Sequence, residues 1–149
     1  MKKTFPMVRS VSGALLIAAL TWGGAASAQF KVGFMATLSG PAAALGQDMY
    51  DGFMLGLEHS GGKFGGVEVE VIREDDQLKP DLAVQTVNRF IERDQVDVVA
   101  GVTFSNVMMA IAKPLADSNT IFMGTNAGPA PLAGERCAPN FFFVSYQND

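Results

Sequence analysis

The sequence predicts an α/β protein with a doubly wound, mainly parallel sheet, and two observations carry this prediction. Short apolar stretches alternate along the chain with longer amphipathic ones, which is the pattern of strands alternating with helices. Residues 98–101 are a run of small and β-branched side chains, typical of a strand buried on both faces. Because crossovers between parallel strands are right-handed, we expect the five predicted strands in the order 2-1-3-4-5.

The first strand is predicted at 30–36, where Phe30, Val32 and Phe34 are apolar at alternate positions. The Gly40-Pro41 pair breaks the chain after it. An amphipathic helix is then expected to run to about Ser60, because apolar residues recur at every fourth position. These residues are Leu45, Met49, Phe53 and Leu57.

The second strand follows a glycine-rich connector at 61–66 and is predicted from the alternation of valine and glutamate over 67–71. It ends at three adjacent acids, 74–76. Ligands of hard cations are usually spaced at alternate positions, so a solvated loop is favoured here over a cation site. Pro80 suits the first position of a second helix, which is expected to close near Asp94.

The buried strand at 98–101 leads into a third helix whose apolar stripe is Val107, Ile111 and Leu115. Ser105 or Asn106 is expected to be its N-cap, since both side chains accept hydrogen bonds from first-turn N–H groups. Two interpretations stay open at this point. Ser105 caps its own helix, or the helix start is a small-anion pocket. A fourth strand at 120–123, a loop at 124–131 and a fifth strand at 140–144 complete the prediction.

In a doubly wound sheet, ligands bind beyond the carboxyl ends of the strands, where the winding direction reverses. Three predicted loops meet there: 36–46, 101–106 and 124–131. They carry hydroxyls, an amide and apolar side chains, which can hydrogen-bond a carboxylate and pack against a hydrophobic group. Dinucleotide, nucleophile-elbow and paired His/Cys metal motifs are missing from the sequence, so we expect neither an enzyme nor a bound cofactor or metal.

Residues 1–28 have the pattern of a cleavable secretory signal peptide: basic residues, an apolar run from Val11 to Trp22, and an Ala-x-Ala ending at Ala28. The whole chain has 11 Lys and Arg against 15 Asp and Glu; three of the eleven lie in the leader, so its removal changes the net charge from −4 to −7. An acidic chain is a poor partner for nucleic acid or an anionic membrane. We expect export to the periplasm without membrane insertion after cleavage.

Residues 29–149 are long enough for one domain with its own core. Cys137 is the sole cysteine of the chain, so it is expected to be either a buried free thiol or paired with a cysteine outside this sequence. The chain ends just after an apolar run. We therefore expect it to be the first part of a longer protein.

The segment 31–41, together with the acids at 74–76, the turn 101–106 and the run Asn126-Ala127-Gly128, resembles the first lobe of a type I periplasmic binding protein. The resemblance is greatest to the branched-chain amino acid binding family that serves ABC importers, and it spans essentially all of 29–149. It implies two α/β lobes that close over a ligand. The second lobe would lie outside this sequence.

The resemblance also implies roles for individual residues. Ser105 would bind the ligand carboxylate, Ala127 would offer its backbone carbonyl to an ammonium group, and Asn126 and Gly128 would complete the carboxylate clamp. Amino acid binders often have an aromatic residue where this chain has Leu45, and a hydroxyl where it has Gly128. The turn that begins at Phe104 is closer to relatives associated with aromatic carboxylates.

The resulting hypothesis is a solute-binding protein that captures a small carboxylate, either a hydrophobic amino acid or an aromatic acid, for the membrane subunits of an ABC importer. One alternative is the ligand-sensing domain of a receptor or regulator built on the same lobe. Another is an exported hydrolase, which is disfavoured because the only histidine, His59, lies outside the three loops.

Overall fold

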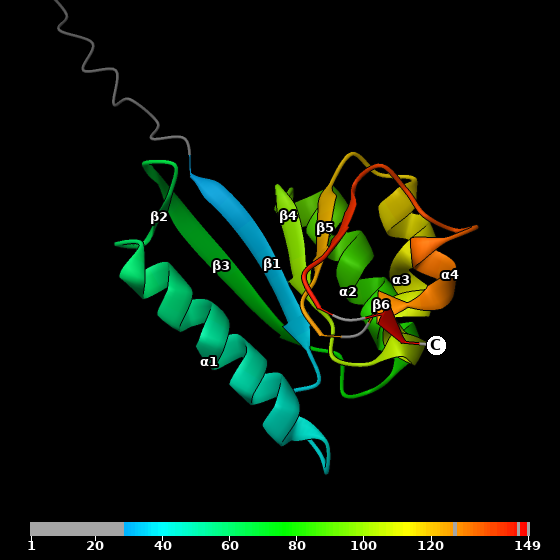
Figure 1. The fold of residues 1–149 in the computed structure, drawn as a ribbon. Helices are drawn as coiled ribbons and strands as arrows, with labels where there is room; N and C mark the ends of the chain where they lie inside the picture. The colour runs from blue at the N-terminus through cyan, green and yellow to red at the C-terminus, as the bar shows by residue number, and fades with distance from the viewer. Residues whose placement is uncertain (1–28, 127, 146, 149) are drawn as a thin grey trace, which may run out of the picture.

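The computed structural model describes residues 29–126, 128–145 and 147–148. The predicted signal peptide lies outside these residues. The chain forms a six-stranded sheet in the order β2-β3-β1-β4-β5-β7 (Figure 1). The expected order is therefore confirmed, with one extra strand at the β3 edge. The strands are β1 (Phe30–Ala36), β2 (Lys63–Phe64), β3 (Val67–Asp75), β4 (Val98–Gly101), β5 (Ile121–Gly124) and β7 (Phe141–Phe143).

The five longer strands are parallel, and only β2 runs antiparallel to its neighbour. Parallel strands need crossover helices, and these cover both faces of the sheet. Three helical segments pack on one face: α2 (Pro80–Arg89), the π-helical turn η1 (Phe90–Asp94) and α3 (Ser105–Ala116). As predicted, Pro80 begins α2.

The larger core lies between the sheet and these helices, and the alternation along the strands decides which side chains reach it. Met35, Val99 and Phe122 point to this face from β1, β4 and β5, and all are fully buried or nearly so. They pack against Ile111 and Leu115 of α3. This core fixes α3 against the sheet, and so fixes where the helix begins.

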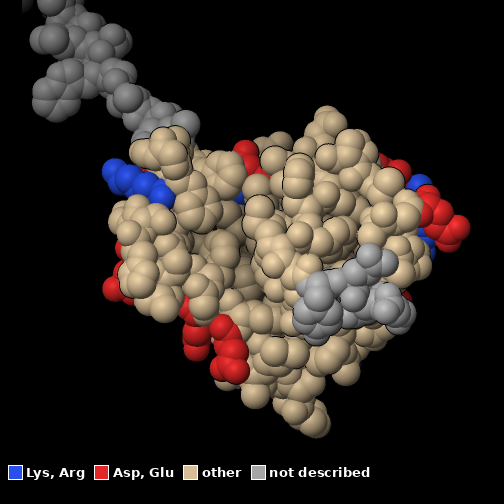
Figure 2. Space-filling model, viewed as in Figure 1, with Lys and Arg blue, Asp and Glu red and all other residues tan. Residues whose placement is uncertain are grey.

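The opposite face is covered by α1 (Ala43–His59), which lies along β1 and β3 (Figure 1). The Phe34 ring of β1 contacts Tyr50 and Phe53 of the helix, each with ring centroids 5.2 Å apart. Farther along the same face, Ile121, Met123 and Phe142 are exposed. Charged side chains lie mainly at the periphery of the face seen in Figure 2, and its centre is uncharged.

The structure corrects two predicted connections. The glycine-rich connector contains the short strand β2, which pairs with β3. The predicted loop at 124–131 contains β6 (Gly128–Pro129) and the start of a short helix, α4 (Ala130–Ala133). The prediction of a loop rested on the glycine and proline content of this segment. Proline is compatible with the first turn of a helix, which is where Pro131 lies in α4. Strand β6 pairs with β8 (Gln147–Asn148) in a separate two-stranded sheet.

Candidate functional site

The three loops predicted to converge do meet at the carboxyl edge of the sheet, and Thr103 joins them. The backbone N–H of Thr37, just after β1, donates to the Thr103 hydroxyl at 3.1 Å. The side-chain amide of Asn126, just after β5, donates to the Thr103 carbonyl at 2.8 Å. Thr103 is buried, so its hydroxyl is part of the scaffold. This hydroxyl of the loop 101–106 is therefore used within the protein, although hydroxyls of the three loops were predicted to be available to a ligand.

Two residues with positive φ turn the chain at the end of β4. Gly101 has φ +106° and Val102 has φ +67°. A β-branched residue rarely adopts this left-handed conformation. The Val102 N–H donates to the Met35 carbonyl at 2.7 Å, and its side chain is fully buried. This turn of the backbone directs Thr103 toward Thr37. It could not be predicted from the sequence, because valine favours extended backbone.

Helix α3 begins at Ser105, one or two residues earlier than predicted, and its N-cap is Phe104 rather than Ser105 or Asn106. The expected capping role is therefore wrong. Phe104 has extended backbone and makes no side-chain hydrogen bond to the helix. The first-turn N–H groups of a helix have no intrahelical acceptors, and an apolar cap supplies none. The positive end of the α3 dipole therefore lies at this edge.

The remaining predicted site residues lie along the same edge. Ser105 is the first residue of α3 and is half-buried, as is Phe104. Asn126 is also half-buried, and its amide N–H is committed to the Thr103 carbonyl, so that group stabilises the loop.

Leu45 lies in the first turn of α1 with 42% of its surface exposed. Its neighbour Gly46 packs against the backbone of Thr37, where a Cβ would collide with the carbonyl oxygen. Gly128 is buried in β6. Ala127 lies outside the described residues, so its expected carbonyl contact stays a prediction.

The acids at 74–76 do not form the solvated loop that was favoured. Asp76 is completely buried, and Glu74 pairs with Arg89 of α2 at 2.5 Å. Asp75 is half-buried and accepts from the backbone N–H groups of Leu38 and Gln77, both at 2.8 Å. The three adjacent acids thus have three different environments. Glu74 and Asp75 are the last two residues of β3, where successive side chains point to opposite faces, and Asp76 follows the strand.

Burial of Asp76 raises the pKa of its carboxyl above the ordinary value, although a hydrogen bond from the Thr37 hydroxyl works against this. The pKa of the neighbouring Asp75 is shifted in the opposite direction, below its ordinary value. Desolvation is its largest single influence and favours the neutral acid, but hydrogen bonds from Ser39, Leu38 and Gln77 together lower its pKa.

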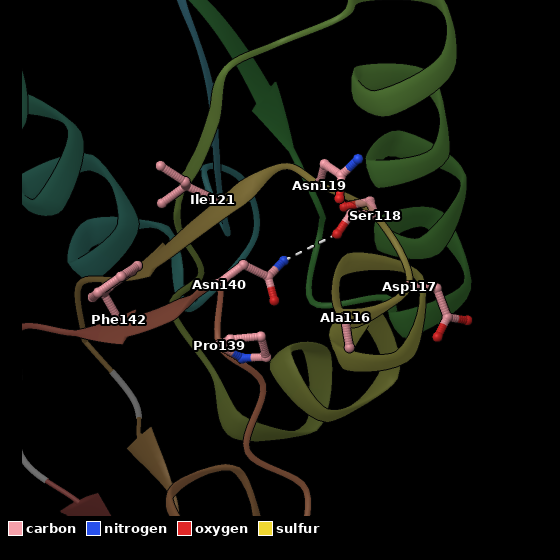
Figure 3. Close-up of a pocket in the computed structure, with 8 residues that line it drawn as sticks. All are labelled: Ala116, Asp117, Ser118, Asn119, Ile121, Pro139, Asn140 and Phe142. Carbon is pink, nitrogen blue, oxygen red and sulfur yellow. Dashed lines mark hydrogen bonds between the residues drawn. The ribbon is translucent and has the colours of Figure 1, made fainter.

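A pocket of about 460 Å³ lies away from this edge, between the end of α3 and the starts of β5 and β7 (Figure 3). Asn140 lies on its wall, and its amide group donates to the carbonyls of Leu115, Ser118 and Thr120. These bonds tie the end of α3 to β5. The pocket shares no residue with the three convergent loops.

Within the part of the chain that the structure describes, no group of three or more His, Cys, Asp or Glu side chains could hold a metal ion. Over the same residues, no helix is both long and apolar enough to traverse a bilayer. His59 is exposed at the end of α1, as expected. Cys137 is exposed and forms no disulfide within the described residues, so the alternative of a buried thiol is wrong. Pairing with a cysteine outside this sequence stays a prediction.

Comparisons with known proteins agree with this architecture. A family model described as periplasmic binding protein matches residues 29–149. The Leu/Ile/Val-binding protein BraC3 of Rhizobium johnstonii is 30% identical over 138 residues, which are 91% of this chain and 37% of that protein.

Solved structures resemble the fold as a whole. An ABC transporter substrate-binding protein from Sphaerobacter thermophilus is 35% identical with a TM-score of 0.76, over 80% of this chain and 33% of that one. A solute-binding protein of an ABC transporter from R. palustris, in complex with benzoate, is 31% identical with a TM-score of 0.75, over 78% of this chain and 32% of that one. The chain thus spans about a third of the length of these relatives.

Proposed function

Because the chain belongs to the type I periplasmic binding protein family, we propose that it is the first lobe of a solute-binding protein that captures a small carboxylate for an ABC importer. The family consists of binding proteins rather than enzymes, which confirms the expectation from the sequence. The predicted leader would deliver the protein to the periplasm and be removed after Ala28. The second lobe and the membrane subunits of the importer would be its partners.

The observation that carries this proposal is the start of α3. The helix begins at the carboxyl edge of the sheet with an apolar N-cap, so its first-turn donors face the edge where ligands of such sheets bind. The Ser105 hydroxyl stands at that same start. A carboxylate suits these donors and the helix dipole.

The apolar side chains of the edge favour a ligand with a hydrophobic body. Phe104 is half-buried beside Ser105, and Leu45 is exposed on α1. Both ligand types occur among the relatives: BraC3 is named as a Leu/Ile/Val-binding protein, and the R. palustris protein was solved in complex with benzoate. We therefore propose a hydrophobic amino acid or an aromatic acid as the ligand class.

Calorimetric titration of the full-length protein with leucine, phenylalanine, benzoate and coumarate tests this function. We expect at least one of them to bind. Replacing Ser105 by alanine should weaken that binding by roughly 1–3 kcal/mol, the usual cost of leaving a charged acceptor without a donor. Ser60→Ala is the matched control, because Ser60 is an exposed serine just beyond the far end of α1. No binding of any acid, or equal binding by the two variants, would contradict the proposal.

A further inference from the structure

A buried carboxylate lies behind the loops of the candidate site. Asp76 has no exposed surface, yet it follows directly after β3 at the edge where the loops meet. Its Oδ1 atom accepts two hydrogen bonds, from the Thr37 hydroxyl at 2.6 Å and from the Leu78 N–H at 2.8 Å. Its own N–H donates to the Ala36 carbonyl at 3.1 Å. Asp76 therefore fixes both the backbone and the side chain of the turn after β1.

Thr37 links Asp76 to the loop that follows the neighbouring strand β4. Its hydroxyl is held by Asp76, and its N–H donates to the Thr103 hydroxyl at 3.1 Å. Its carbonyl oxygen lies against Gly46 of α1. Both threonines are buried, so water does not compete for these bonds. A buried polar chain thus crosses from β3 through β1 to β4.

This series of buried hydrogen bonds ends at Thr103, next to the residues proposed to bind the ligand. Thr103 lies two positions before Ser105, and its carbonyl accepts from Asn126, which immediately precedes Ala127. It also follows Gly101 and Val102, whose positive φ values need surrounding contacts to persist. A shift of Thr103 would therefore move the start of α3 and the loop after β5 together.

We propose that Asp76 is a positioning residue that acts through Thr37 and Thr103 to hold Ser105 and the loop after β5 in their ligand-binding arrangement. This inference rests on the proposed function. Asp76 itself is completely buried, so it acts on the ligand only through the two threonines. Binding sites need such supporting contacts, because a misplacement of the contact residues costs affinity.

The test uses two pairs of variants of the full-length protein. Asp76→Ala and Thr37→Val remove the hydrogen bond between the two side chains, whereas Asp76→Asn and Thr37→Ser each keep a group that can make it. Thr120→Val is the control, because Thr120 is also a buried threonine but lies just before β5, at the amino end of the strand. The affinity for whichever of the four acids binds the wild type is measured by calorimetry. Amide hydrogen exchange is followed over 102–106 and 124–126.

We expect Asp76→Ala and Thr37→Val to weaken binding about tenfold or more. Losing a buried hydrogen bond to a charged group lets the loops leave their ligand-binding arrangement, and the affinity falls with the fraction of protein that keeps it. Exchange should accelerate in both segments. Thr37→Ser and Asp76→Asn should restore most of the affinity, and Thr120→Val should leave it unchanged. If Asp76→Ala does not fold, the Thr37 pair decides the question.

Wild-type affinity and wild-type exchange in Thr37→Val would overturn the proposal. The same holds if Thr120→Val weakens binding as much as Thr37→Val, since general destabilisation would then be the cause. If the wild type binds none of the acids, the proposed function fails. The exchange measurement then still decides whether Asp76 and Thr37 hold the two loops.

Discussion

At the scale of single residues, the site depends on how closely backbones approach at the end of β4. A Cβ at Gly101 would collide with the Met35 carbonyl oxygen, and the residue has φ +106°. Both facts call for glycine. The next residue, Val102, keeps its left-handed conformation because its N–H bonds to Met35 and its side chain is buried.

Gly101→Ala is therefore expected to lower the free energy of unfolding by roughly 2 kcal/mol or more, from backbone strain and overpacking together. Gly52→Ala is the control, because a Cβ at this position on α1 meets nothing within 4 Å. That change should be neutral or stabilising by up to about 1 kcal/mol. Urea unfolding measures both, and equal effects would contradict the assigned close approach.

The two adjacent aspartates should give opposite dependences of stability on pH. The pKa of Asp76 is raised, so the folded state holds its proton more tightly than the unfolded state. Its contribution to stability is then greatest in acid and is lost as pH rises through the folded pKa. The pKa of Asp75 is lowered, so its contribution is present above the unfolded pKa and is lost as pH falls.

The unfolding free energies of Asp76→Asn and Asp75→Asn, each compared with the wild type between about pH 3 and pH 7, check these signs. The stability of Asp76→Asn relative to the wild type should increase as pH rises. That of Asp75→Asn should decrease. Curves of the same sign for both variants would show that the two carboxyls share one environment.

Sequence patterns located the edge better than they assigned its single residues. The burial of Asp76 could not be read from three adjacent acids, because it depends on Thr37, a residue 39 positions away. The N-cap at Phe104 was missed for a similar reason. The preference for serine or asparagine at caps is a local rule, and here the positive φ values before Thr103 set where the helix begins.

At the scale of elements, the alternation of strand side chains sorts the phenylalanines of β5 and β7 onto two faces. Phe122 packs edge-on against Phe141 and Phe143, with ring centroids 5.4 Å and 6.0 Å away. Phe142 points to the other face and is 51% exposed. Strands β1 and β3 were predictable from such alternation and β4 from its apolar run, whereas β2 and α4 were too short to show a period.

Phe122→Ala is expected to cost about 3–5 kcal/mol of unfolding free energy, the usual range for emptying a buried aromatic site. Phe142→Ala, the same change one strand away, should cost about 1 kcal/mol or less in this chain. Thermal or urea unfolding of the two variants distinguishes them. Similar losses would mean that β7 pairs with β5 in a register other than Phe122 beside Phe141.

At the scale of the whole molecule, the order of the strands explains why three distant loops form one edge. Strands β1 and β4 are neighbours in the sheet. The connection after β1 runs to β3 on one side and the connection after β4 runs to β5 on the other, so the loops after β1 and β4 face each other. The sequence predicted this order and the meeting of the loops. The order depends only on alternating elements and right-handed crossovers, which are properties of the whole chain.

We propose that the carboxyl edge of the sheet is one side of a ligand cleft, over which a second lobe would close. Ser105 and the first turn of α3 would supply donors to the ligand, and the buried hydrogen bonds from Asp76 to Thr103 would keep these donors in place. The affinity of the full-length protein would thus depend on residues that never contact the ligand.

The decisive measurement of where the ligand binds is a crystal structure of the full-length protein with a bound acid, benzoate or leucine. We expect the ligand carboxylate within hydrogen-bonding distance of Ser105 and the first-turn N–H groups of α3. A ligand bound elsewhere, for example in the pocket beside Asn140 near the end of α3, would contradict it.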